Sequence, residues 1–178
     1  GDSRPDPYAD IPDRQPVMHR TAAGDAGPDG WCLAESTRGA FSVMLPGKFN
    51  DTMHKMGTTT GGTSIFHTVL TKTADGADFN ATRFEIIGAR PPGSPPEMMV
   101  HRFRELGGKI VREEIVLAGL PGTRMHVEAQ GTTADMVLIT TPWNDYMLAV
   151  QFLGPISPSL QQDVERFLQS FKIKQPRQ

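Results

Sequence analysis

Three Met-His pairs are the feature of this sequence that points most directly to chemistry: Met18-His19, Met53-His54 and Met125-His126. Thioether and imidazole groups suit copper. Met53, His54 and Met56 lie within four residues of a segment that we expect to be a loop, so their side chains could converge on one ion. A copper-binding protein that uses these three ligands is therefore the alternative hypothesis for function. Its competitor is ordinary packing, because methionine fills cores well.

Motifs for catalysis are missing from the sequence. It contains no Gly-x-Ser-x-Gly elbow, phosphate loop, dinucleotide fingerprint or His-Glu-x-x-His. His67 and His126 could meet Glu85 or Glu128 across a sheet, but such clusters are more often structural than catalytic. We therefore expect a protein that is not an enzyme and needs no cofactor.

An aromatic side chain in a turn is the strongest hint of a binding surface. Trp143 lies in the turn at residues 142–145, and it either folds back onto the domain or faces a partner. The polar, Thr/Gly-rich segment 48–62 is predicted to be a mobile loop. If both lie at the same end of the sheet, Trp143 would border a shallow groove, so it is the candidate ligand-binding residue.

The elements that must position these residues are predicted from hydrophobic period and turn signals. Strands are expected at 41–45, 64–72, 79–88, 109–118, 123–130, 134–141 and 146–153. An Asp-Gly turn joins the second and third of these, and the last four have the short connections of an antiparallel meander. Helices are expected from Ser94 to about Leu106, and from Ser157 to about Phe171. Their buried stripes comprise Met99, Val100, Phe103 and Leu106, and Leu160, Val164, Phe167, Leu168 and Phe171.

This order, with strands and helices segregated, predicts an α+β domain: an antiparallel sheet of about six to seven strands flanked by helices. Residues 1–30 are rich in proline, aspartate and glycine and lack an apolar period. We expect them to form a flexible leader or tether, with any local docking around Val17 and Met18, and a single domain over residues 31–178.

Composition excludes several classes of function. The formal charge of −2 argues against nucleic-acid binding, which needs a basic surface. No apolar run approaches the length of a membrane-spanning helix. The single cysteine, Cys32, excludes an internal disulfide.

Three landmarks resemble the PsbP-like family: the strand Phe41-Ser-Val-Met-Leu-Pro46, the turn Gly119-Leu-Pro-Gly122, and the closing segment 164–171. The resemblance spans roughly residues 35–174 and implies a PsbP-like sandwich, a fold shared with bacterial envelope proteins such as DcrB and LpqN. It carries over no catalytic residue, because the family has no common catalytic motif.

The resemblance and the leader together lead to a functional expectation. They imply a non-catalytic envelope protein, exported or lipid-anchored, periplasmic or otherwise associated with the envelope. It would bind a protein partner or a small apolar ligand. The leader would serve as a spacer from the membrane, with an acylated cysteine upstream of Gly1.

Overall fold

The computed structural model describes residues 6–57, 61–90, 93, 95–142 and 144–174, and these form two helices and eleven strands in two sheets. The elements in chain order are β1 (Val17–Ala23), β2 (Cys32–Glu35), β3 (Phe41–Leu45), β4 (Phe49–Gly57), β5 (Thr63–Lys72), β6 (Asp78–Ile87), α1 (Pro95–Glu105), β7 (Lys109–Leu117), β8 (Leu120–Ala129), β9 (Thr132–Thr140), β10 (Asn144–Leu153), α2 (Pro158–Gln169) and β11 (Lys172–Ile173).

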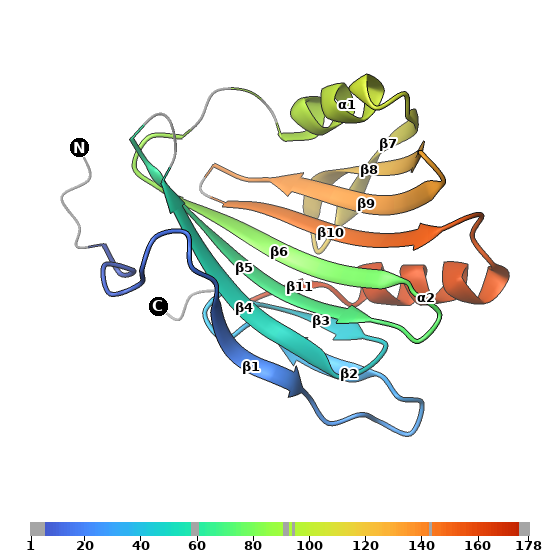
Figure 1. The fold of residues 1–178 in the computed structure, drawn as a ribbon, viewed down its shortest axis with the longest axis horizontal. Coiled ribbons are helices and arrows are strands. Elements are labelled where there is room, and N and C mark those ends of the chain that lie inside the picture. Colours follow the sequence, from blue (N-terminus) through green and yellow to red (C-terminus); the bar gives the residue numbers. More distant parts are fainter. Residues whose placement is uncertain (1–5, 58–60, 91–92, 94, 143, 175–178) are drawn as a thin grey trace.

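The larger sheet has eight strands in the order β1-β4-β5-β6-β10-β9-β8-β7, and the smaller has the order β11-β3-β2. Every neighbouring pair is antiparallel. The α+β class and the meander are confirmed, whereas the estimate of six to seven strands is wrong. The smaller sheet and α2 pack on one face of the larger sheet, here named the inner face; α1 packs on the opposite, outer face (Figure 1).

Strand β4 occupies most of the segment that the sequence predicts to be a mobile loop. Its residues alternate between buried and half-buried, with Phe49, Asp51 and Met53 on the inner face. The buried aspartate hides this period from a hydrophobicity pattern. Its carboxylate is compensated by Arg20, whose Nη2 lies 2.9 Å from Oδ2, and by the backbone N–H of Thr37 at 3.1 Å.

Part of the expected leader also belongs to the fold. Val17–Ala23 forms β1, which pairs with β4 at the edge of the large sheet through an irregular register. Ahead of it, Tyr8 is 5% exposed and packs with Met53 and Ile65. The prediction of a leader without regular structure is therefore wrong for these residues, because a single aromatic anchor and a bulged strand carry no period.

The main core lies between the inner face and the layer made by α2 and the smaller sheet. Helix α2 buries Val164, Phe167 and Leu168, and Phe171 follows it into the same cluster, which confirms the predicted stripe. The rings of Phe79 and Phe167 meet edge to face, with centroids 5.4 Å apart. Neither helix in the described part of the chain is long and apolar enough to cross a membrane.

Helix α1 covers only one half of the outer face. Val100 is buried and Met99 and Phe103 are partly buried, against the second cluster on β8, β9 and β10. Leu106 is 47% exposed, so its predicted burial is wrong: the helix ends one residue earlier. The outer surfaces of β4, β5 and β6 extend beyond the helix, and the boundary between covered and uncovered sheet is where a pocket forms.

Candidate functional site

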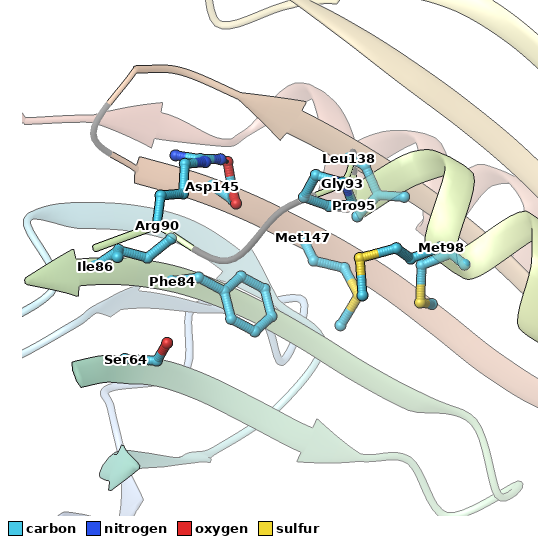
Figure 2. A pocket seen from close by; sticks show the side chains of 11 residues that line it. Ser64, Phe84, Ile86, Arg90, Gly93, Pro95, Met98, Leu138, Asp145 and Met147 are labelled. Carbon is cyan, nitrogen blue, oxygen red and sulfur yellow. Dashed lines mark hydrogen bonds and ion pairs between the residues drawn. The ribbon is translucent and has the colours of Figure 1, made fainter. Parts of the chain in front are cut away.

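A pocket of about 250 Å³ lies between the first turns of α1 and the outer face of the large sheet. Five strands or segments meet there: β5, β6, β9, β10 and the connection that leads into α1. The lining side chains are Ser64, Phe84, Ile86, Arg90, Pro95, Met98, Met99, Leu138, Asp145 and Met147, with Gly93 beside them. Figure 2 shows how these side chains surround the cavity.

The floor of the pocket is built from cross-strand neighbours. Ser64 of β5 lies opposite Ile86 of β6, and Phe84 lies opposite Asp145 of β10. Met147 faces Leu138 of β9 in the same way. Because every second residue of a strand points to one face, these side chains emerge together on the outer surface.

The wall of the pocket comes from α1 and the residues before it. Pro95 opens the helix, and Met98 projects beside the sheet while remaining 58% exposed. Gly93 has a φ of +98°, and a side chain there would meet the Met98 sulfur at 3.4 Å. The glycine therefore lets the chain turn into the helix without filling the cavity.

One ion pair marks the end of the pocket opposite the methionines. Arg90 Nη2 lies 2.5 Å from Asp145 Oδ1, and Arg90 Nη1 donates to the carbonyls of Thr141 and Pro142. Figure 2 shows this pair at one end, Phe84 between, and Met98 and Met147 at the other end. The pair fixes the connection that enters α1 to the β9–β10 end of the sheet.

Chemically, this arrangement can bind and orient an apolar group. Its surface is dominated by methionine, phenylalanine and aliphatic side chains, which is typical of ligand pockets, and methionine adapts to differently shaped ligands. Ser64 is the one hydroxyl group among the described lining residues, and no histidine lines the pocket with it. The lining therefore supplies contacts rather than a nucleophile with its base.

Sequence reasoning missed this pocket because each of its residues also fits an ordinary structural role in a strand or helix. Phe84, Ile86 and Met147 lie in predicted strands, and Met99 lies in the predicted buried stripe of the first helix. The missing signal is that α1 is too short to cover the outer face. That length is visible in the sequence, but the width of the sheet is not.

The predicted ligand-binding residue, Trp143, lies outside the described residues. The structure does show that the β4–β5 and β9–β10 connections emerge at the same end of the sheet, because Gly57 pairs with Thr63, Thr63 with Ile87, and Asn144 with Glu85. The pocket lies at this end as well. Most of segment 48–62 is strand β4 rather than a loop, so the groove beside Trp143 stays a prediction.

The three residues of the copper hypothesis do not converge in the structure. Met53 is fully buried on the inner face, where it packs with Tyr8 and Ile65. His54 and Met56 point to the outer face, and His54 lies edge-on to Phe66. The hypothesis needed a loop. In a strand, successive side chains point to opposite faces, so the side chains of Met53 and His54 are kept apart. In the described part of the chain, no three His, Cys, Asp or Glu residues are grouped to hold a metal either.

Of the four residues in the predicted polar cluster, the structure joins two pairs in different places. His67 Nε2 lies 3.0 Å from Glu85 Oε2, and His126 Nε2 lies 3.7 Å from Glu128 Oε1. The first pair lies on the inner face, where His67 is buried and Glu85 partly buried, and it has a third member that sequence reasoning missed. Tyr8 donates a hydrogen bond to Glu85, and its oxygen lies 3.3 Å from His67 Nε2.

The ionisation of this cluster is set by burial and by its hydrogen bonds. Burial opposes the charge on Glu85, but hydrogen bonds from His67 and Tyr8 outweigh it and lower the pKa of Glu85 below its ordinary value. Burial first, and the bond to Glu85 second, raise the pKa of Tyr8 well above its usual range. Since His67 is fully buried, we interpret the cluster as a clamp on the segment around Tyr8 rather than as a catalytic site.

Two comparisons with known proteins gave no match. No family model matches the sequence, and no curated protein matches it. Among solved structures, the chain is similar to the crystal structure of LpqN, described as involved in cell envelope biogenesis of Mycobacterium tuberculosis. The two share 14% identity over 91% of this chain and 86% of LpqN, with a TM-score of 0.46. Similarity at this level assigns no function to the chain.

Proposed function

We propose that this protein is a non-catalytic binding protein that holds a small apolar ligand, or the apolar part of a larger one, in the pocket between α1 and the outer face. The observation that carries the proposal is the lining itself. Phe84 and Met147 offer contacts from the sheet and Met98 from the helix, and the charged groups are confined to the pair of Arg90 and Asp145. Burial of apolar ligand surface would supply the affinity.

The pocket favours a small ligand over a protein as the partner. It is a concave, apolar cavity bounded by a helix and four strands, and the ion pair at one end could orient a polar end of the ligand. Met98, more than half exposed, is free to adjust its rotamer to the ligand.

The test measures binding of a neutral apolar probe, N-phenyl-1-naphthylamine, by its fluorescence. We expect the intact protein to bind it saturably. Met98→Gln keeps the length of the side chain but adds an amide to the pocket, and should weaken binding several-fold. Ser64→Phe fills the floor and should weaken it by at least tenfold.

The matched control is Met18→Gln. Met18 is also an exposed methionine, 51% against 58% for Met98, but it lies on β1 at the far edge of the sheet. Its replacement should leave the dissociation constant unchanged. Equal binding by native protein, Met98→Gln and Ser64→Phe would refute the pocket as the binding site.

An exported or lipid-anchored location in the envelope is a further part of this proposal. Its support is the sequence resemblance to PsbP-like proteins described above. Fractionation of cells that produce the protein from its complete gene tests it: we expect the protein in the envelope or periplasmic fraction. Recovery with a cytoplasmic marker would contradict the proposed location without affecting the proposal for the pocket.

A further inference from the structure

Strand β7 is an open edge of the eight-stranded sheet. It pairs with β8 on one side and ends the strand order on the other. Among the described residues, the backbone hydrogen bonds found outside regular ladders include none from residues 109–117. An edge of this kind presents N–H and C=O groups to a further strand. Val111 and Val116 also expose 68% and 73% of their surface there.

The side chains of β7 match one another when two copies of this strand are placed side by side in antiparallel orientation. We propose that β7 pairs with β7 of a second copy of this chain, about a two-fold axis at Glu113, so that the two large sheets become continuous. In this register Ile110 lies opposite Val116 of the second copy, and Val111 lies opposite Ile115. Arg112 then lies opposite Glu114 of the second copy.

Each of these pairs lies on one face of the joined sheet. Ile110, Arg112 and Glu114 are register partners of Val127, Met125 and Thr123, whose strand positions face the outer side. The odd-numbered residues of β7 face the inner side. The four apolar residues Ile110, Val111, Ile115 and Val116 therefore meet apolar ones, and Arg112 meets Glu114 on the outer face, which is the favourable arrangement across strands. At the two ends of the strand, Leu117 lies opposite Lys109.

Neighbouring registers do not have this complementarity. An axis at Arg112 places two arginines opposite each other and sets Val111 against Glu113. An axis at Glu114 sets Arg112 against Val116 and Glu113 against Ile115. An axis between residues would join the inner face of one copy to the outer face of the other. The charges on this edge thus select one pairing of the strand with itself.

Arg112 fits the same register, although it already has partners in its own chain. Its Nη1 lies 2.5 Å from Glu97 Oε1 and its Nε lies 3.6 Å from Glu114 Oε1. Because a guanidinium has five N–H donors, it can serve Glu114 of the second copy as well in this register. The two Glu113 side chains on the axis repel each other. Arg124 lies opposite Glu113 on β8 but is bound to Asp135 and Glu165, so the contact between the two Glu113 side chains is a cost to this register. The contact is small for a protein interface, so we expect weak, rapidly exchanging association.

Because the association is expected to be weak, the register is tested by linking the two copies through an engineered disulfide. In Glu113→Cys, the two new thiols face each other on the axis at a strand separation of about 4.5–5.5 Å, within the range that a disulfide spans. In the matched control, Val111→Cys, the thiols lie four residues apart along the strands, about 14 Å, and cannot bridge. The native Cys32 is buried, so the unmodified protein controls for its contribution.

After mild oxidation we expect a disulfide-linked dimer from Glu113→Cys at a yield at least fivefold above that of Val111→Cys. In the Glu113→Cys background, Arg112→Glu and Glu114→Arg should each reduce the yield severalfold, and the double exchange should restore it. Circular dichroism checks that every variant is folded. Equal yields from the two cysteine positions, or no dimer from Glu113→Cys, would overturn the proposal, as would failure of the double exchange to restore the yield in folded protein.

Discussion

The hydroxyl of Tyr8 donates a hydrogen bond to the carboxylate of Glu85, although the two residues are 77 positions apart in the chain. Lys55 reinforces this connection, because its Nζ donates to the backbone carbonyl of Tyr8 at 2.9 Å. The ring of Tyr8 also packs under the guanidinium of Arg38, 4.5 Å from the ring centre. The segment before β1 is thus attached to the inner face by the Tyr8 side chain and by hydrogen bonds from Lys55 to its backbone.

Replacing Tyr8 with phenylalanine should lower the free energy of unfolding by about 1–3 kcal/mol, because a partly buried carboxylate and a buried imidazole lose a hydrogen-bond partner. Urea denaturation measures the change. The control is Tyr146→Phe, since the Tyr146 hydroxyl has no hydrogen bond among the described residues. An equal loss in both variants would show that the clamp does not stabilise the fold.

Acid should weaken the fold through Glu85. Its pKa is lower in the folded protein than its ordinary value of 4.5, so its contribution is present above pH 4.5 and is lost as the pH falls through the folded-state pKa. Stability measured from pH 6 downward should therefore decline, and Glu85→Gln should decline less steeply. Tyr8→Phe should also flatten the profile, because it removes one hydrogen bond to the carboxylate. Parallel profiles for all three proteins would contradict this.

Deletion of residues 1–16 separates the two descriptions of the leader. The sequence predicts that the leader is uncoupled from the domain, so that removal of residues 1–28 moves the melting temperature by a few degrees at most, and the shorter deletion by no more than that. The structure predicts a loss of several kcal/mol, because the deletion uncovers Met53 and Ile65 and leaves His67 and Glu85 without Tyr8. Differential scanning calorimetry decides between them.

Replacing Phe167 with alanine should cost about 3–5 kcal/mol, because this ring is fully buried against Phe79. Gln169→Ala, on the exposed side of the same helix, should change stability by less than about 0.5 kcal/mol. Chemical denaturation measures both. A loss below about 1 kcal/mol for Phe167→Ala would show that α2 does not anchor the core.

Elements with strong local signals could be predicted from the sequence. The β5–β6 hairpin has its Asp-Gly turn, where Gly76 adopts a φ of +91°. Helix α2 begins at Ser157, whose side chain accepts a hydrogen bond from the backbone N–H of Leu160, and its apolar residues have a helical period. In both cases, the residues that determine the structure lie within a few positions of one another.

Elements that depend on distant partners could not be predicted. Strand β4 is stable because Arg20 neutralises the buried Asp51, and the two residues are far apart in sequence. The two-residue strand β11 exists because Lys172 lies opposite Ser42 of β3. The pocket likewise depends on how strands from four parts of the chain are ordered, so its residues could not be grouped beforehand even though each was assigned to an element.

The position of β11 has a consequence for when the domain can fold. Strand β3 lies between β2 and β11, and α2 supplies one side of the main core, so residues 158–173 complete a core that residues near 32–45 begin. Such contacts close very long loops and form slowly. During synthesis, the part of the inner face that α2 covers therefore stays uncovered until residue 173 has left the ribosome. The apolar side chains of this face are exposed on the emerging chain. A chaperone would therefore bind these strands rather than a chain terminus.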